Sequence, residues 1–458
     1  MADPRPDPKI VTLGPDFYDA VQPADFPQCT IRFANTRWAK RIGLDLDEAG
    51  WASHFCRFEP LPDNLPQPLA LRYHGHQFRV YNPDIGDGRG FTFAQFRDDQ
   101  GRLLELGTKG SGQTPYSRHA DGRLTLKGGM REVLATEMLE ALGVNTSKTF
   151  ALFETGEELE RGDEPSPTRS AVLTRLSHGH IRIGTFQRLA FFGQADNLKA
   201  LTRYCLDELY GAQPGEDDAG NATRLFDRVC SATATLAASY LAVGFVHGVL
   251  NSDNINITGE SFDYGPWRFT PFWDPEFTAA YFDHGGLYAF GRQPEAIHWD
   301  IAQLAGCLAI NAAAPALSEL LGSWSSRFED ELTKALVARL GIVAGDNDRP
   351  VAGALIRALA TKAASIDRVF FDWRGGCDPG ADRYPAEEFR ALAKLLEGRG
   401  IPPTHEYWSD PAPCSMPIDE VERIWSDIAE RDDWQAFNNK VKAIRRMGAA
   451  IKQDAPHR

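Results

Sequence analysis

Two short segments carry side chains that could hold a metal ion and move a proton. The first reads His247-Gly248-Val249-Leu250-Asn251-Ser252-Asp253-Asn254, and the second reads Asp263-Tyr264-Gly265. Asn254 and Asp263 offer hard oxygen ligands that suit Mg²⁺ bridging nucleotide phosphates, and Asp253 is a candidate general base. The alternatives are an Asn/Asp turn that holds no ion, and a cap or loop hydrogen bond for Asp253.

The first segment has the spacing of a protein-kinase catalytic loop without its base. In the pattern H-R-D-x-x-x-x-N, the Asp accepts the proton of the substrate hydroxyl and the Asn holds a metal ion. His247 and Asn254 keep this spacing, whereas Val249 stands where the Asp would be. The pattern indicates either an inactive kinase relative or a nucleotide enzyme with a different reaction.

A lysine and a glutamate upstream could orient phosphates. Lys109 ends a predicted strand, and Glu132 lies early in the next predicted helix. In kinase-like folds such a Lys contacts nucleotide phosphates, and such a Glu fixes its flexible ammonium group. A surface salt bridge is the alternative, and the metal motif downstream favours the functional interpretation.

Other residues could cradle phosphate oxygens. Gly-rich turns direct backbone amides toward anions, and an arginine fork donates two parallel hydrogen bonds to phosphate. Common turns and local ion pairs are the alternatives, and no segment has the Walker pattern G-x-x-x-x-G-K-[ST]. His178 and His180 are interpreted as structural, because no Cys or carboxylate lies near them in the sequence. The phosphate candidates are Gly86, Gly88, Arg89, Lys109, Asp121, Gly122, Arg175 and Arg182.

A sheet-rich first half and a helix-rich second half would position these residues. Strand patterns at Phe91–Phe96 and Leu103–Thr108 flank a turn, and helical spacing runs over Met130–Leu142. The polar stretch Glu157–Thr168 has the composition of a hinge or loop between two lobes. We therefore expect an α+β, bilobal, protein-kinase-like (pseudokinase) fold with an additional helical C-terminal region. The expected division is 1–65 as an N-terminal extension, 66–160 as N-lobe, 161–330 as C-lobe, and 331–458 as a C-terminal helical extension.

Composition restricts the class of protein. A chain of 458 residues exceeds one hydrophobic core, so two or three subdomains are expected. The net charge of −14 argues against a nucleic-acid partner. The 7 cysteines form no C-x-x-C pair, which favours reduced thiols in a reducing compartment. The first residues lack an apolar signal core and no run reaches membrane-spanning length, so we expect a cytoplasmic protein without a membrane partner.

At these residues the chain resembles the selenoprotein O family, the bacterial YdiU-like proteins, over most of its length. Arg79 and Ala120 depart from the family pattern, which usually has Gly at both positions, and Trp299-Asp300 replaces a usual Trp-Asn pair. The matching blocks are Gly75-His76-Gln77-Phe78, Gly86-Asp87-Gly88-Arg89, Lys109-Gly110-Ser111-Gly112-Gln113-Thr114-Pro115-Tyr116-Ser117-Arg118, His247–Asn254 and Phe262-Asp263-Tyr264-Gly265-Pro266.

The resemblance implies a pseudokinase-like enzyme that binds ATP in a flipped orientation. It would transfer AMP, or in some members UMP, to Ser, Thr or Tyr hydroxyls of proteins. Asp253 would accept the proton, Asn254 and Asp263 would hold Mg²⁺ or Mn²⁺, and Glu132 would pair with Lys109. Nucleotide contacts are implied for Gly86, Gly88, Arg89, Lys109, Asp121, Gly122, Arg175 and Arg182. The alternatives are a kinase-like phosphotransferase and a catalytically inactive nucleotide-binding scaffold.

Overall fold

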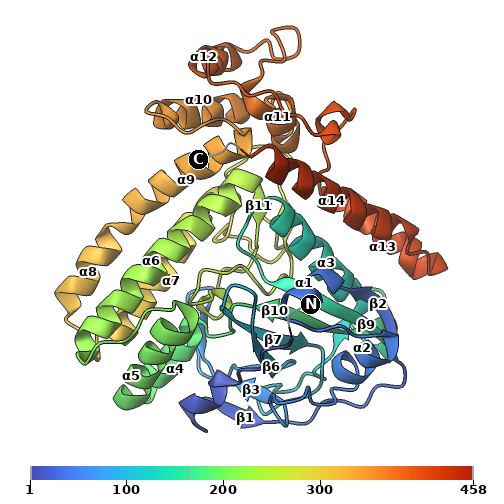
Figure 1. Cartoon of the computed structure of the whole chain (residues 1–458), viewed down its shortest axis with the longest axis vertical. Helices are drawn as coiled ribbons and strands as arrows, with labels where there is room; N and C mark the ends of the chain where they lie inside the picture. Colours follow the sequence, from blue (N-terminus) through green and yellow to red (C-terminus); the bar gives the residue numbers. More distant parts are fainter. Residues whose placement is uncertain (1–2, 163, 456–458) are drawn as a thin grey trace.

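An antiparallel sheet is the largest β-structure of the protein, seen in the lower part of the computed structural model in Figure 1, which describes residues 3–162 and 164–455. The strand order is β1-β3-β6-β7-β10-β9-β2, with β8 paired to β10. Two small antiparallel pairs, β4–β5 and β11–β12, lie outside it. The strands are β1 Tyr18–Ala20, β2 Thr30–Ala34, β3 Leu69–Leu71, β4 Gly75–Gln77, β5 Val80–Asn82, β6 Thr92–Arg97, β7 Leu103–Lys109, β8 Leu124–Thr125, β9 Lys148–Leu159, β10 Thr168–Ser177, β11 Phe245–Val246 and β12 Arg268–Phe269.

The sheet is buried on both faces, because alternate side chains of a strand point to opposite sides. Phe153 of β9 packs into a cluster with Trp51 and Phe55 of the N-terminal helices. Its neighbour Leu152 packs into a second cluster that contains Met130 of the helix on the other face. The strands therefore contribute side chains to a cluster on each face of the sheet.

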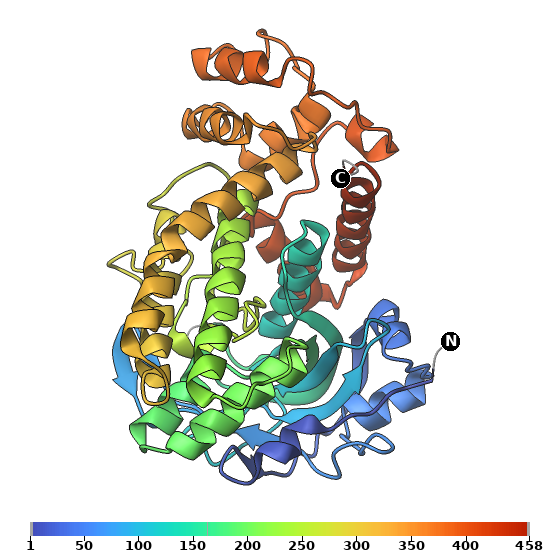
Figure 2. The same cartoon turned by 60° about the vertical axis from the view of Figure 1, so that its left-hand side comes forward.

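Helices form most of the rest of the chain, and the long pair α6 and α9 pack against each other on one side of the molecule (Figures 1 and 2). Within the described residues, no helix combines the length and the apolar character needed to cross a membrane. The helices are α1 Thr36–Arg41, α2 Glu48–Phe55, α3 Leu126–Ala141, α4 Ile183–Phe191, α5 Ala195–Tyr204, α6 Asp218–Val243, α7 Gln293–Leu308, α8 Ala314–Gly322, α9 Trp324–Leu340, α10 Asp348–Ala360, α11 Ile366–Asp372, α12 Glu387–Leu396, α13 Ile418–Arg431 and α14 Gln435–Gln453, with a short 3₁₀ turn η3 at Ser252–Asn254.

Helix α3 lies between the sheet and the C-terminal helices, and Figure 2 shows α14 running alongside it. The Thr125 hydroxyl caps its start by accepting a hydrogen bond from the Gly128 amide at 3.1 Å. On the outer side, Arg445 of α14 donates to both carboxylate oxygens of Glu137, at 2.7 and 2.8 Å. The position of α3 is therefore fixed both at its first turn and on its outer side.

The predicted hairpin and helix are confirmed as β6–β7 and α3, and the chain is mixed α and β with an antiparallel sheet. The prediction that Glu157–Thr168 joins two lobes is wrong. β9 and β10 are antiparallel neighbours in one sheet, so this stretch supplies the connection of a hairpin and the ends of its two strands. The four-part division of the chain stays a prediction, and β9 pairs with β10 across its boundary at residue 160.

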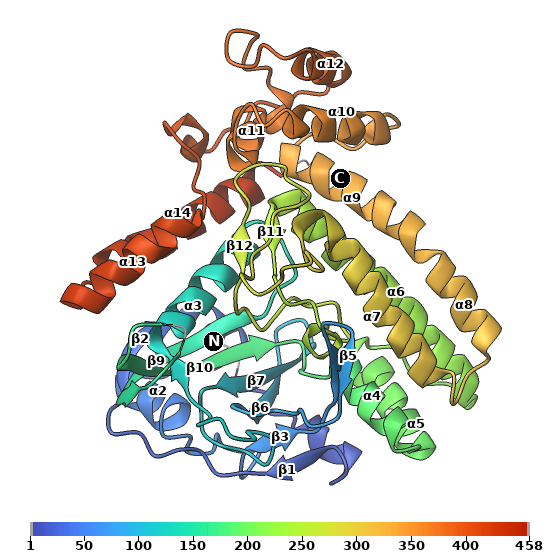
Figure 3. The same cartoon turned by 180° about the vertical axis from the view of Figure 1, so that it is seen from behind.

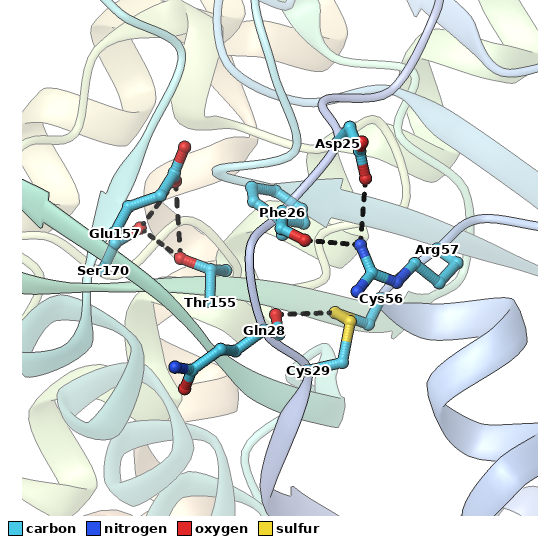
Figure 4. Close-up of a disulfide and its surroundings, with 9 residues drawn as sticks. All are labelled: Asp25, Phe26, Gln28, Cys29, Cys56, Arg57, Thr155, Glu157 and Ser170. Carbon is cyan, nitrogen blue, oxygen red and sulfur yellow. Dashed lines mark hydrogen bonds and ion pairs between the residues drawn. A yellow bond between two sulfur atoms is a disulfide. The ribbon is translucent and has the colours of Figure 1, made fainter.

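The prediction of reduced thiols is wrong for two cysteines, since Cys29 and Cys56 form a disulfide (Figure 4). They are separated by 27 residues, and only the packing of β2 near the end of α2 brings them together. Arg57 fixes the same segment by donating to the Phe26 carbonyl at 2.5 Å and to Asp25 at 3.0 Å. The cysteines outside this pair are free thiols, at Cys205, Cys230, Cys307, Cys377 and Cys414.

Candidate functional site

A cavity of about 370 Å³ lies where the ends of β7 and β10 meet the His247–Asn254 loop. Cations outnumber carboxylates in its walls, although the whole chain carries a net charge of −14. Such a local excess of positive charge suits a polyanion such as a triphosphate. The cations are Arg89, Lys109, Arg118, Arg175 and Arg182, and the carboxylates are Asp87, Asp253 and Asp263.

The His247–Asn254 loop is held by three separate parts of the fold, which are the β4–β5 hairpin, Tyr288 and helix α4. Asn251 Oδ1 accepts hydrogen bonds from the Phe78 amide at 3.0 Å and from the Tyr288 hydroxyl at 2.6 Å. Ser252 Oγ accepts from the His76 amide at 2.7 Å and donates to Gln187 of α4 at 2.6 Å. The β4–β5 hairpin therefore rests directly on the turn that carries Asp253.

His247 has a structural role in this loop. Its Nε2 lies 2.9 Å from the Phe262 carbonyl, so this nitrogen carries the proton and donates it. Burial lowers the pKa of His247, which keeps the ring neutral. The bond links the loop to the residue next to Asp263, and it fixes the two predicted metal-binding segments relative to each other.

Asp253 is a buried carboxyl group with one oxygen that accepts no hydrogen bond from residues 3–162 or 164–455. Its Oδ1 has no hydrogen-bond partner among the described residues, and the side chain lines the cavity. Burial raises the pKa of Asp253 to about 6, against the opposing charge of Arg182. A carboxylate with this pKa is ionised at neutral pH and more basic than an ordinary Asp, which suits a general base.

The predicted ion pair between Lys109 and Glu132 is confirmed, with 2.6 Å between the ammonium nitrogen and Oε2. The same ammonium group lies 2.9 Å from Asp263 Oδ1. Burial would raise the pKa of Asp263, but Lys109, Arg175 and Arg182 hold it well below its ordinary value. Asp263 is therefore a carboxylate at any pH at which the protein would work.

A buried chain of polar groups that the sequence did not reveal orients Arg175. Arg175 Nε donates to His180 Nε2 at 3.1 Å, and His180 Nδ1 donates to Glu105 Oε1 at 2.5 Å. Burial lowers the pKa of His180, so the ring is a neutral bridge. The ring fits because residue 107, opposite Arg175 in the sheet, is Gly: a Cβ there would lie 2.4 Å from it.

Arg182 is held between aromatic rings at the start of α4. Its guanidinium carbon lies 4.1 Å from the Tyr73 ring centroid and 5.0 Å from that of Phe262. Asp87 Oδ1 lies 3.5 Å from Arg182, and burial raises the pKa of Asp87. Tyr73 and Asp87 both line the cavity, and Asp87 could have been suspected from its place in the Gly86-Asp87-Gly88-Arg89 block.

Gly86 and Gly88 line the cavity, and their small size is required by protein packing. A Cβ on Gly86 would lie 2.5 Å from the Tyr116 ring, and one on Gly88 would lie 2.9 Å from the Tyr116 carbonyl. The segment therefore lies flat against the Thr114–Arg118 block. This reason for the glycines holds whether or not their amides also contact phosphate.

Four predicted residues lie outside the lining of the cavity: Glu132, which reaches it only through Lys109, and Asp121, Gly122 and Asn254. Asp121 pairs with Arg161 at 2.8 Å. Gly122 has a φ of +70°, and a Cβ on it would lie 2.3 Å from Gly112. Asn254 is fixed by donating its amide to the Val249 carbonyl at 2.9 Å. Their roles in nucleotide and metal binding stay predictions.

The residues present fit a divalent metal ion. The bond from Asn254 to the Val249 carbonyl occupies the amide nitrogen, which leaves the side-chain oxygen of Asn254 as a possible ligand. Asp263 is ionised and Asp253 Oδ1 is a buried oxygen without a partner among the described residues. The described residues contain no metal-binding group of three or more His, Cys, Asp and Glu side chains. A hard ion at this site would therefore depend on phosphate oxygens for part of its coordination.

A larger cavity, of about 840 Å³, lies between the ends of α6 and α9 and the C-terminal helices. Its walls are mainly apolar. Arg374, one of its cations, donates to backbone carbonyls, including Arg339 at 3.0 Å and Asp454 at 2.8 Å. The smaller cavity, whose walls carry more cations than carboxylates, is therefore the better candidate for a phosphate site.

Known proteins of one family are similar to this chain over most of its length. Residues 4–384 match the family described as Protein adenylyltransferase SelO. The chain is similar to a Protein nucleotidyltransferase YdiU of Synechocystis sp., with 40% identity over 96% of this chain and 97% of that protein. It is also similar to the protein of that name from Synechococcus elongatus, with 44% identity over 96% of this chain and 95% of that protein.

Proposed function

Because the chain belongs to the SelO/YdiU family of nucleotidyltransferases, we propose that it transfers AMP, or UMP, to Ser, Thr or Tyr hydroxyls of proteins. The nucleoside triphosphate would bind in a flipped orientation within a kinase-like bilobal fold. Its acceptors would be proteins of the cytoplasm, and neither a nucleic acid nor a membrane would be a partner. The carrying observation is the position of Asp253, a buried carboxyl group with one oxygen unpaired within the described part of the chain, in a cavity lined by five cations and in a loop whose kinase base position is Val249.

The proposed reaction is an attack of the acceptor oxygen on the α-phosphorus. The bond from the α-phosphorus to the oxygen bridging to the β-phosphate breaks, and pyrophosphate leaves. Asp253 accepts the proton of the hydroxyl. Lys109, Arg175 and Arg182 neutralise the charge that develops on the leaving pyrophosphate, because they are already fixed by Glu132, His180 and the flanking rings.

Mg²⁺ or Mn²⁺ would be held by Asn254 and Asp263, and it would supply charge neutralisation on the phosphates. Asp263 is suited to this because Lys109 and Arg175 keep it ionised. Its side chain also lies 3.4 Å from Arg175, so the metal ligand and the phosphate-binding cations share one network.

The test uses ATP labelled on either the α- or the γ-phosphate, with Mg²⁺ or Mn²⁺ and the full chain. We expect α-label, but no γ-label, to become attached to the protein itself or to added proteins, and intact mass to rise by one nucleotide monophosphate. Transfer of γ-label alone would assign a phosphotransferase. ATP-induced thermal stabilisation without transfer of either label would assign a nucleotide-binding scaffold.

A further inference from the structure

Large apolar side chains lie exposed on both sides of the β4–β5 hairpin. We name the aromatic rim the set Phe191, Phe192, Tyr281 and Phe282, whose exposed fractions are 56%, 53%, 79% and 41%; Val80 in the hairpin itself is 70% exposed. Exposed apolar groups that gather in one place mark sites of interaction more often than single ones do.

Ring contacts make each side of the rim a continuous surface. On one side, Tyr81 stacks on Phe191 at 5.5 Å, and Phe191 meets Phe192 edge-on at 5.1 Å. On the other side, Phe282 contacts Phe78 at 5.9 Å and Tyr281 at 5.1 Å. Tyr81 and Phe78 belong to the same hairpin, so the hairpin joins the two sides.

The rim is continuous with the proposed reaction centre. The hairpin amides of His76 and Phe78 bond to Ser252 and Asn251, the two residues before Asp253. Figure 3 shows β5 next to α4, whose first turn follows Arg182 in the cavity wall.

The length of α4 sets the distance from the cavity to the rim. Phe191 ends the helix that Arg182 precedes, and a rise of 1.5 Å per residue places it about 13 Å away. An extended chain covers about 3.3 Å per residue, so this separation corresponds to about four residues. The triphosphate would occupy the cationic walls of the cavity, which leaves the apolar rim for the other reactant.

We propose that the aromatic rim docks the acceptor protein as an extended segment, which carries an apolar side chain about four residues from the modified hydroxyl. This inference rests on the proposed function, since it names the acceptor chemistry of the same site. The affinity for the acceptor would come from burying the exposed rings of the aromatic rim, and the groups of the cavity would carry out the transfer.

The test is transfer of α-labelled nucleotide to a library of twelve-residue peptides with a central Ser, Thr or Tyr and random flanks. We expect the modified peptides to be enriched in apolar residues three to five positions from the hydroxyl. With the best peptide, the double variant Phe191→Ser/Phe192→Ser should raise KM about tenfold or more and leave kcat and the affinity for ATP unchanged. The matched control is Ile401→Ser, which removes an apolar side chain of similar exposure, 49%, between α12 and α13.

Each other result overturns the inference. Equal KM values for the rim and control variants, or peptides without apolar enrichment, would do so. Self-modification without any peptide modification would show that the acceptor is not an extended segment. Loss of a dimer by the double variant at unchanged KM would make the rim an interface between copies. Absence of any α-label transfer by the wild-type protein would remove the proposed function itself, and the inference with it.

Discussion

Replacing Asp253 by Asn should slow nucleotidyl transfer strongly while making the protein more stable at neutral and alkaline pH. The reason is that burial raises the pKa of Asp253 to about 6, whereas an Asp in the unfolded chain has a pKa near 3.9. Between these values the folded state keeps a proton that the unfolded state has released. Raising the pH through this range therefore lowers the free energy of unfolding.

The size of the effect follows from the two pKa values. Above pH 6 the folded protein carries the full cost of the buried carboxylate, about 3 kcal/mol, and at pH 4 it carries almost none. Asn has nearly the same shape and cannot ionise. If all 458 residues unfold together, about 3 kcal/mol corresponds to a Tm increase of about 3 °C at pH 8. Transfer should fall by about 10² to 10⁴, the range for a lost general base.

The assay is a thermal melt at pH 4 and pH 8 beside transfer of α-labelled nucleotide. Glu260→Gln is the matched control, because burial raises the pKa of Glu260 to about 7 and its carboxylate does not line the cavity. The control should also gain stability relative to the wild-type protein as the pH rises, over a range that ends near pH 7 and not near pH 6, and it should keep its transfer activity. A Tm at pH 8 that falls in Asp253→Asn would refute the cost of burial, and retained transfer would refute the role of base.

Three further outcomes are expected. Gly75→Ala should lower kcat and leave the affinity for ATP unchanged, because the new Cβ would lie 2.9 Å from the Asp253 side chain and would displace it. An unchanged kcat would show that the reaction tolerates this displacement of Asp253. His180→Leu should raise KM for ATP because it leaves Arg175 Nε without its acceptor, and His180→Gln should restore part of the affinity for ATP. Equal KM values in the two variants would show that the contact between His180 and Arg175 has only a structural role. Asp263→Asn should remove the dependence of transfer on Mg²⁺ or Mn²⁺ concentration together with most activity, and an unchanged metal titration would remove Asp263 from the metal site.

Local periodicity predicted the elements that carry their own signal. The hairpin of β6 and β7 has β-type residues on both sides of a turn, and helix α3 has apolar residues at helical spacing. The prediction for Glu157–Thr168 was wrong because its polar residues and prolines are typical of a loop within a hairpin as well as of a loop between lobes. The disulfide could not be predicted from the sequence, since Cys29 and Cys56 meet only after β2 and α2 have packed.

The candidate site could be predicted where charge and spacing coincide. The ion pair of Lys109 and Glu132 could be predicted because a strand end and the following helix bring a cation and an anion together. His180 and Glu105 could not be assigned in this way. Their partnership with Arg175 depends on the pairing of β10 with β7 and on the space above Gly107, and neither is visible in a linear sequence. Buried polar chains of this kind are set by tertiary contacts.

The position of α3 makes the C-terminal helices part of the architecture of the site. Glu132 faces Lys109 on the inner side of α3, and Glu137 on the outer side is held by Arg445 at 2.7 Å and lies 3.4 Å from Arg37. The same helix thus carries a contact to the cavity and contacts to both ends of the chain. A shift of α3 by one turn, about 5.4 Å, would break both sets of contacts together. The orientation of Lys109 therefore depends on residues far outside the cavity, including a helix beyond residue 384, where the family match ends.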